Sequence, residues 1–313
     1  MTADAGVEIL LGTHDGERYL AQQLDSILGQ TYRDWRLTIR DDGSSDGTRA
    51  IADDYARRFP DRITVSSRET ASGSAARNFL ELVAASTGRW VMLADQDDVW
   101  LPDKIAVTLE RMRALEARLG PGVPALVHTD LQVTDADLTV VEPSMIRSQV
   151  LDGHETRLAA LVIQNHVTGC TVMVNRALAD KVTPPFEGVA MHDWWLALLA
   201  GTFGTLELVD RPTVLYRQHG ANTVGARSAR TLRYKIARAT DRAGVVASLR
   251  ASYTQAGAFL DHYRDALTTD QAALLRAAAT LGEQGRLTRL ATIRRHGLWK
   301  NTWIKRWGQV LYG

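Results

Sequence analysis

Segments with the residue spacing of a β-strand alternate with segments that have the spacing of a helix, from residue 7 to residue 94. Apolar strand patterns cover residues 7–11, 35–39, 63–65 and 90–94, and helical patterns cover residues 17–29, 48–59 and 72–83. A chain that alternates in this order forms an α/β domain, in which helices cover a sheet of largely parallel strands. We therefore predict a Rossmann-like α/β fold with a mainly parallel central sheet.

Polar side chains follow three of these strands at the point where each strand ends. The clusters are Thr13-His14-Asp15, Asp41-Asp42 and Asp95 to Asp98. Ligands of open parallel sheets bind beyond the carboxyl ends of the strands. The three clusters are therefore predicted to line one site.

The third cluster places carboxylates at positions 95, 97 and 98, directly after an apolar strand. These carboxylates repel one another, and removing them from water without a partner is costly. A divalent metal ion that carries a phosphorylated ligand would relieve the repulsion. The competing interpretation is a solvated acidic turn in which Asp98 caps the following helix.

The remaining pattern predicts strands over residues 125–129, 168–174, 206–209 and 214–216, and helices over residues 102–119, 155–163 and 191–200. After residue 225 the strand patterns disappear, and we predict several amphipathic helices. Trp299, Trp303 and Trp307 recur at every fourth position, which places them on one face of a predicted helix.

Charge is distributed unevenly along the chain. The 313 residues have a net charge of +1, yet residues 225–313 contain sixteen Lys and Arg against five Asp and Glu. This asymmetry indicates that the C-terminal part faces an anionic partner. Cys170 is the single cysteine, so an intrachain disulfide is excluded and a reducing cytosol is expected. We find neither a signal-peptide pattern nor an apolar run long enough to span a bilayer.

Six segments in this order resemble the inverting family 2 glycosyltransferases of the GT-A fold, and most closely the bacterial members described as rhamnosyltransferases. The segments are residues 11–20, 22–27, 40–48, 95–105, 192–195 and 216–220, so the resemblance covers about residues 7–225. One departure is His14, which stands where the family has an aromatic residue in a Thr-Tyr-Asn ending. The resemblance implies a GT-A catalytic domain over residues 1–225, followed by a basic helical region over residues 226–313.

The implied reaction transfers a sugar from a nucleotide diphosphate to an acceptor hydroxyl, with inversion at the anomeric carbon. The leaving diphosphate needs its growing charge neutralised, which a divalent metal does as a Lewis acid. By resemblance, Asp97 is a metal ligand, His219 is a further ligand, and Asp95 lies near the ribose or a metal-bound water. Carboxylates suit Mn²⁺ or Mg²⁺, and the imidazole favours Mn²⁺. The alternative for His219 is a surface histidine beside a glycine turn.

The acceptor hydroxyl must lose a proton as it attacks, and a carboxylate near the start of a helix can accept that proton. The resemblance favours Asp193 in this role of general base. The alternative is a helix N-cap, the commonest role of an aspartate before an apolar helix. For the neighbouring His192 we expect local hydrogen bonding.

Recognition of the nucleotide is expected from Thr13, Asp42 and Arg77. Asp42 can accept a hydrogen bond from the imide N–H of uracil or thymine, although turn formation is a competing role. Arg77 can meet the base or a phosphate, with a plain surface arginine as the alternative.

Four further residues are predicted to face the donor sugar or the acceptor. They are Asp98, Trp100, Trp194 and Trp195. The two adjacent tryptophans can form a stacking platform for an acceptor sugar, and at least one of them is expected to belong to the core.

The implied donor is dTDP-rhamnose or a UDP-sugar, and the implied acceptor is a saccharide or a lipid-linked hydroxyl used in bacterial surface polysaccharide synthesis. The expected location is the cytoplasm. One interpretation places the basic C-terminal helices on the anionic inner face of the cell membrane. The other makes them a helical cap or a homodimer face.

Three other functions are compatible with parts of this pattern. Nucleic-acid binding is not expected, because the basic and aromatic residues form no recognised module. A dehalogenase-type phosphatase is set aside, because the first strand lacks its Asp-x-Asp-Gly start. The alternative function that stays open is a catalytically silent, nucleotide-sugar-binding partner subunit.

Overall fold

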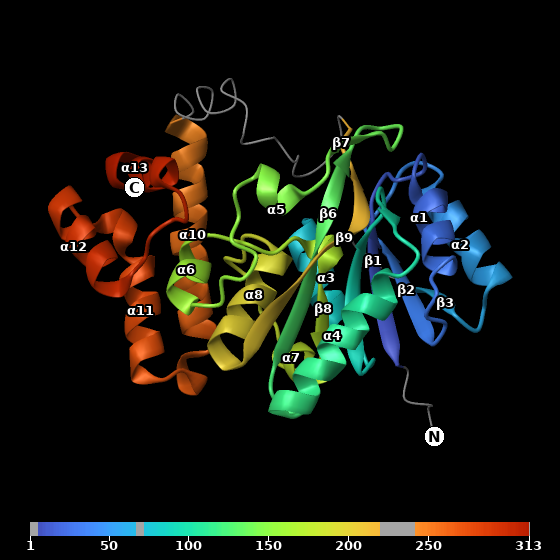
Figure 1. Cartoon of the computed structure of the whole chain (residues 1–313), viewed down its shortest axis with the longest axis horizontal. Coiled ribbons are helices and arrows are strands. Elements are labelled where there is room, and N and C mark those ends of the chain that lie inside the picture. The colour runs from blue at the N-terminus through green and yellow to red at the C-terminus, as the bar shows by residue number, and fades with distance from the viewer. Residues whose placement is uncertain (1–5, 67–71, 220–241, 313) are drawn as a thin grey trace.

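The structure, a computed structural model, describes residues 6–66, 72–219 and 242–312. In this part of the chain a nine-stranded sheet has helices on both faces (Figure 1). The strands are β1 (Val7–Thr13), β2 (Trp35–Asp41), β3 (Ile63–Ser66), β4 (Trp90–Asp95), β5 (Val99–Trp100), β6 (Ala125–Thr134), β7 (Val140–Glu142), β8 (Met173–Asn175) and β9 (Thr205–Arg217). The helices are α1 (Leu20–Leu28), α2 (Thr48–Arg58), α3 (Ala75–Ala85), α4 (Lys104–Leu119), α5 (Met145–Ser148), α6 (Leu158–Ile163), α7 (Arg176–Ala179), α8 (His192–Phe203), α10 (Arg242–His262), α11 (Thr269–Ala279), α12 (Arg286–His296) and α13 (Trp303–Tyr312).

The strand order is β3-β2-β1-β4-β8-β6-β9-β5, with β7 paired to β6. Strands β1 to β4 run parallel to one another, as predicted. Strand β8 is antiparallel to both β4 and β6, whereas β6 and β9 are parallel. The predicted α/β fold is confirmed, and its sheet is parallel in the first half and mixed in the second.

The pairing register brings the ends of β1, β2 and β4 to one edge of the sheet. Thr13 is paired with Asp41, and Gly12 is paired with Asp95. Alternation along β1 sets the register, because Ile9 packs in the core cluster on one face of the sheet and Leu10 in the cluster on the other. The polar residues that follow the three strands therefore meet, as the strand-end pattern predicted.

Two predicted elements differ in the structure. The strand predicted over residues 168–174 starts instead as a 3₁₀ turn, η1 (Gly169–Thr171), and β8 begins only at Met173. The N–H of Gly169 donates to the Asp193 carboxylate (3.0 Å) rather than to a neighbouring strand. The strands predicted at 206–209 and 214–216 form the single strand β9, which follows β6 through two irregularities in register.

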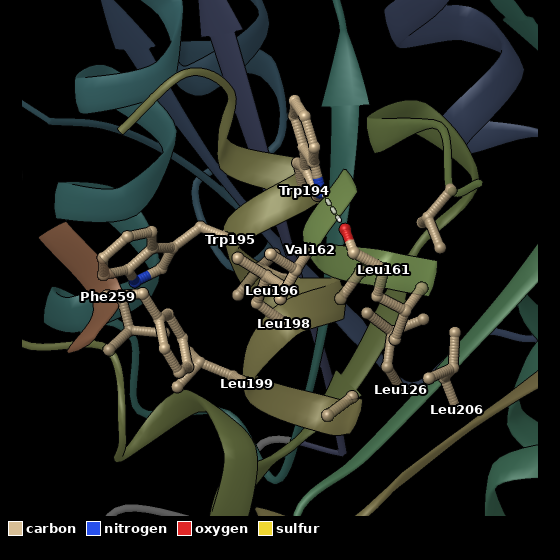
Figure 2. Packing of buried hydrophobic residues seen from close by; sticks show 14 of the residues in the cluster. Leu126, Leu161, Val162, Trp194, Trp195, Leu196, Leu198, Leu199, Leu206 and Phe259 are labelled. Carbon is tan, nitrogen blue, oxygen red and sulfur yellow. Dashed lines mark hydrogen bonds between the residues drawn. The ribbon is translucent and has the colours of Figure 1, made fainter. Parts of the chain in front are cut away.

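The C-terminal helices α10, α11 and α12 share a hydrophobic core with α6 and α8. Trp195 of α8 contacts Phe259 of α10, with ring centroids 5.0 Å apart, and Figure 2 shows the two rings together beside the leucines of α8. Leu275 and Ile293 are fully buried in the same cluster. Among the described residues, no helix combines the length and the apolar composition that crossing a bilayer requires. The predicted boundary at residues 225 and 226 lies outside the described residues and stays a prediction.

The prediction that three tryptophans share a helical face is wrong for Trp299. Helix α12 ends at His296, and Gly297 turns the chain with a φ of +67°. Trp299 therefore precedes α13 and packs against the core. Trp303 and Trp307 alone lie on α13, where they are 70% and 59% exposed.

Candidate active site

The edge at the ends of β1, β4 and β9 brings together the two residues predicted as metal ligands. Oδ2 of Asp97 lies 2.8 Å from Nε2 of His219, and each side chain is 14% exposed. The ring of Tyr19 packs against the imidazole, with ring centroids 4.8 Å apart. The pair is therefore held in place and partly shielded, but it still reaches the surface.

Asp95, at the end of β4, lies beside this pair. Burial, together with the negative charges of Asp97 and Asp193, raises the pKa of Asp95. Asp193 accepts the N–H of Gly169, which lies just before β8, and β8 pairs with β4, so the predicted base lies at the same edge as the predicted metal ligands. Three carboxylates from β4, the turn after it and α8 converge here, and a cation would offset their repulsion.

Two groups of side chains at this edge could hold a metal ion. Asp97 and His219, with Asp95 beside them, offer the carboxylate and imidazole donors that Mn²⁺ accepts, and the carboxylates also suit Mg²⁺. Asp95, Asp98 and Cys170 form the second group, with ligand atoms within 4.8 Å of one another. Asp98 and Cys170 are completely buried, and burial raises the pKa of both groups, which favours their protonated forms. Asp97 and His219 each stay 14% exposed, whereas Asp98 and Cys170 are completely buried, so the first group is the one that a metal ion with a bound diphosphate could reach.

Asp98 is an interior residue, which corrects its prediction as a sugar-side contact. It is 0% exposed, and its Oδ1 accepts the backbone N–H of Arg217 (3.2 Å). It does not cap the following helix either, because Asp103 holds the N-cap position of α4. Trp100 is likewise buried, at 2% exposed, with the Lys104 ammonium 4.8 Å from its ring. Asp98 and Trp100 support the acidic turn from inside and offer no surface to a sugar.

Arg217, the last residue of β9, holds the acidic turn in position. Its Nε donates to the backbone carbonyl of Asp97 (2.9 Å), its Nη1 to the carbonyl of Ala136 (2.5 Å), and its Nη2 to Oε1 of Gln22 (2.5 Å). The guanidinium also lies 4.5 Å from the centre of the Tyr19 ring, the ring that contacts the imidazole. This one buried side chain therefore positions the surroundings of both candidate ligands.

Asp193 lies in the first turn of α8, and the N-cap position belongs to Met191. The Asp193 carboxylate accepts the N–H of Trp194 (2.6 Å), the N–H of Gly169 (3.0 Å) and Nδ2 of Asn165 (2.9 Å). Burial raises the pKa of Asp193 to about 6, although these hydrogen bonds oppose the rise. A carboxylate with a pKa just below neutral pH is suited to accept a proton from a hydroxyl.

His192 makes no hydrogen bond within the described part of the chain, contrary to the prediction. Both ring nitrogens are buried without a partner, and the ring packs 4.3 Å from that of Phe79, centroid to centroid. Burial lowers the pKa of His192 to about 3, so the ring is neutral. A Cβ on Gly169 would lie 2.4 Å from Nε2 of His192, so the imidazole fills the space that this glycine leaves.

Trp194 and Trp195 belong to the core, which corrects their prediction as an acceptor platform. They are 8% and 1% exposed. Figure 2 shows the indole N–H of Trp194 donating to the carbonyl of Leu161, at 2.5 Å. Trp195 points the other way, against Phe259. Apolar residues at the start of α8 were therefore a signal of burial rather than of sugar binding.

The residues predicted for nucleotide binding are brought together only in part. Thr13 and Asp42 adjoin, because the N–H of Asp42 donates to the carbonyl of Thr13 (2.8 Å). The Asp42 carboxylate accepts the N–H and the hydroxyl of Ser72 (2.5 and 2.6 Å). Arg77, in the first turn of α3, pairs with Glu81 on the same helix (2.8 Å).

The family profile described as "Glycosyl transferase family 2" matches residues 9–122, from β1 to the loop after α4. The chain contains a family 2 glycosyltransferase domain. The matched stretch contains the acidic turn with Asp97, whereas Asp193 and His219 lie beyond it.

Two curated relatives extend the likeness over the later part of this glycosyltransferase. The dTDP-rhamnosyl transferase RfbG of Shigella flexneri is 25% identical over 236 residues, which are 72% of this chain and 77% of that one. The Escherichia coli enzyme WfgD, named UDP-Glc:alpha-D-GlcNAc-diphosphoundecaprenol beta-1,3-glucosyltransferase, is 27% identical over 194 residues, or 62% of this chain and 69% of that one.

Two solved structures share the fold of the glycosyltransferase. A fragment of S. aureus TarS in complex with UDP-GlcNAc superposes with a TM-score of 0.52 at 15% identity, covering 94% of this chain and 93% of that one. The mannosyltransferase PcManGT from Pyrobaculum calidifontis, in complex with GDP-Man and Mn²⁺, has a TM-score of 0.52 at 20% identity, covering 95% of this chain and 87% of that one. These likenesses bear on the fold alone.

Sequence reasoning missed three residues at the site: Arg217, Tyr19 and Asn165. Arg217 and Tyr19 fall inside segments that resemble the family. Their position could therefore have marked them as site residues, although the resemblance gave them no role. Asn165 lies in a stretch without a clear period. Its contact with Asp193, 28 positions away, appears only once α8 packs against the segment that follows α6.

Proposed function

We propose that this glycosyltransferase moves a sugar from a nucleotide diphosphate sugar to an acceptor hydroxyl, with a divalent metal ion and with inversion at the anomeric carbon. One observation carries the proposal: the Asp97–His219 pair and the Asp193 carboxylate share one edge of the sheet. The Asp97–His219 pair can bind a cation that neutralises the leaving diphosphate. The Asp193 carboxylate can accept the proton of the attacking hydroxyl.

Asp97 and His219 would hold the metal ion, Mn²⁺ or Mg²⁺, and Asp95 would lie near the ribose or a metal-bound water. When bound, such an ion neutralises the charge that grows on the diphosphate as the sugar leaves. The donor set described above supports this assignment. The neighbour PcManGT, which was solved with Mn²⁺ and GDP-Man, is consistent with it.

Asp193 would accept the proton of the acceptor hydroxyl while the hydroxyl oxygen attacks the anomeric carbon. The N–H donors of Asn165 and Gly169 hold the carboxylate in one orientation. Attack from the side opposite to the leaving diphosphate inverts the anomeric carbon in a single displacement. Such a displacement needs one base and no covalent intermediate, which agrees with the single candidate base.

Thr13, Asp42 and Arg77 are proposed to recognise the nucleotide. RfbG is named for a dTDP-sugar, WfgD is named for UDP-Glc, and the TarS structure contains UDP-GlcNAc. Thymine and uracil share the imide N–H that the Asp42 carboxylate can accept. We therefore propose dTDP-rhamnose or a UDP-sugar as the donor.

The proposed acceptor is a saccharide or a lipid-linked saccharide of bacterial surface polysaccharide synthesis. The name of WfgD includes a lipid-linked acceptor, and TuaG of Bacillus subtilis is named for teichuronic acid biosynthesis. A lipid-linked acceptor would place the reaction in the cytoplasm at the inner face of the cell membrane. No observation favours a catalytically silent subunit, since candidates for both the base and the metal site are present.

A screen of dTDP- and UDP-sugars with Mn²⁺ tests the proposal. A ligand that binds only the native state raises the melting temperature, and a hundredfold excess over the dissociation constant adds about 2.7 kcal/mol of stability. We expect one donor class to raise the Tm and to release nucleotide slowly in the absence of an acceptor. If no nucleotide sugar binds with Mn²⁺, the proposal is wrong.

The rate of transfer is expected to fall about tenfold per pH unit below about pH 6. The reason is that the pKa of Asp193 is raised to about 6, so that its protonated form, which cannot accept a proton, predominates in more acidic solution. The dependence of kcat/KM on pH measures this. An acid limb centred near 3.8, the ordinary value for an aspartate, would contradict the role of the buried carboxylate.

A further inference from the structure

Helix α13 presents an apolar stripe to solvent. Trp303, Trp307 and Leu311 follow one another at intervals of four residues and are 70%, 59% and 47% exposed. Residues with this spacing share one face of a helix. Single exposed apolar residues are normal on a protein surface, but a continuous stripe with two tryptophans marks an interaction surface.

The other side of α13 is fixed to the protein. Gln309 is 0% exposed, its Nε2 donates to the carbonyl of Leu298 (2.7 Å), and its Oε1 accepts the N–H of Lys300 (3.3 Å). Gly308 faces α10, where a Cβ added to it would lie in ordinary van der Waals contact, 3.5 Å from Cγ1 of Val245. The helix therefore holds its tryptophans outward without any rearrangement.

The C-terminal segment that contains the stripe is rich in basic residues and has no acidic residue. Residues 284–313 include seven Lys and Arg and no Asp or Glu. Arg294 and Arg295, in the last turn of α12, and Arg306, on α13, are exposed. Tryptophans suit the boundary between lipid headgroups and acyl chains, and Lys and Arg suit anionic lipid phosphates.

Helix α13 lies on the upper side of the molecule in Figure 1, the side at which β6 and β9 end. Figure 1 shows α13 at the level of α5 and the β6–β7 turn, and Ala136 of that turn accepts a hydrogen bond from the arginine of the site. Just before α13, the N–H of Asn301 donates to Oε1 of Gln164 (3.3 Å). The next residue, Asn165, donates to Asp193 (2.9 Å). The segment just before α13 is therefore connected to the candidate base through the adjacent residues Gln164 and Asn165.

We infer that α13 docks the enzyme on a bilayer of anionic lipids, with Trp303 and Trp307 in the headgroup layer and the neighbouring cations on lipid phosphates. The inference deepens the proposed function, on which its role in catalysis rests, because it makes a membrane the source of the acceptor. A second copy of the chain fits this face less well. A two-fold contact through α13 would bring together two copies of a segment, residues 284–313, that has seven Lys and Arg and no Asp or Glu.

Sedimentation of the full chain with lipid vesicles tests the inference. One set of vesicles contains equal parts of phosphatidylglycerol and phosphatidylcholine, and the other contains phosphatidylcholine alone. The test variant carries Trp303→Ser and Trp307→Ser. The matched control is Leu287→Ser, because Leu287 is an 85% exposed apolar residue on α12, outside the stripe.

We expect the wild type and the Leu287→Ser control to bind the anionic vesicles, and the double variant to bind them at least about tenfold more weakly. Binding to phosphatidylcholine alone should also be at least about tenfold weaker, and added salt should release the protein. The inference is overturned if the wild type binds neither kind of vesicle, if it binds both equally, or if the double variant binds like the wild type. It is also overturned if the wild type is a dimer that the double variant dissociates.

The Tm increase caused by a nucleotide sugar, measured without vesicles, separates this inference from the proposed function. The double variant should keep that increase, because neither tryptophan lies at the candidate site. A wild type that binds a nucleotide sugar but no vesicle overturns the docking surface alone. A wild type that binds anionic vesicles but no nucleotide sugar overturns the proposed function alone.

Discussion

Asp193→Asn is expected to lower the rate of sugar transfer by about 10²- to 10⁴-fold, the range that general base catalysis contributes. The amide cannot take up the proton of the acceptor hydroxyl. It keeps an oxygen for the N–H donors of Trp194 and Asn165, but its NH₂ group then faces the N–H of Gly169. We therefore also expect a loss of about 1–3 kcal/mol in the free energy of unfolding. Steady-state kinetics and urea denaturation measure the two effects.

Asp210→Asn is the matched control, because Asp210 is an exposed aspartate on β9, in the same domain. This control should leave both rate and stability nearly unchanged. In Asp193→Asn, metal-dependent binding of the nucleotide should survive although transfer is slowed. Transfer at a rate close to that of the wild type would mean that another group is the base.

Arg217→Lys is expected to weaken Mn²⁺-dependent nucleotide binding by at least about tenfold and to lower the free energy of unfolding by about 3 kcal/mol. A lysine keeps the charge but cannot replace a planar group that donates to Asp97, Ala136 and Gln22 at once. Without these bonds the acidic turn loses its fixed position. The Mn²⁺ concentration for half-maximal activity should rise accordingly.

Arg211→Lys controls for the substitution itself. Arg211 lies on the same strand, its side chain is 51% exposed, and it pairs with Asp103 at the surface, so the change should cost little. A purely structural role for Arg217 would lower stability without changing the Mn²⁺ requirement. That result would remove Arg217 from the residues that position the metal ligands.

The first half of the fold could be predicted because its local patterns agree with its tertiary structure. Strands β1, β2 and β4 end in polar clusters, and parallel pairing then forces those clusters to one edge, as Thr13 opposite Asp41 illustrates. The second half was harder, because its strands take partners far away in the sequence. The continuity of β9, for example, depends on pairing with β6 through two register irregularities.

The sequence pattern does not show which side chains of the site point into the interior and which reach the surface. Asp97 and Asp98 are adjacent and chemically identical, yet one carboxylate contacts His219 and the other accepts the N–H of Arg217 in the interior. Likewise Trp194 and Trp195 resemble a sugar platform in sequence. Trp195 is buried because Phe259 of the C-terminal helices covers it, and Trp194 is buried beside Leu161 of α6.

The central claim is that Asp97 and His219 bind a nucleotide through a divalent metal at this edge of the sheet. Calorimetric titration of dTDP and UDP into the wild type and into Asp97→Asn, each with Mn²⁺ or with EDTA, tests it most directly. We predict that one of the two nucleotides binds the wild type with Mn²⁺, and that EDTA or Asp97→Asn weakens this binding at least about tenfold. Equal affinity with Mn²⁺ and with EDTA, or an unchanged affinity in Asp97→Asn, would contradict the claim.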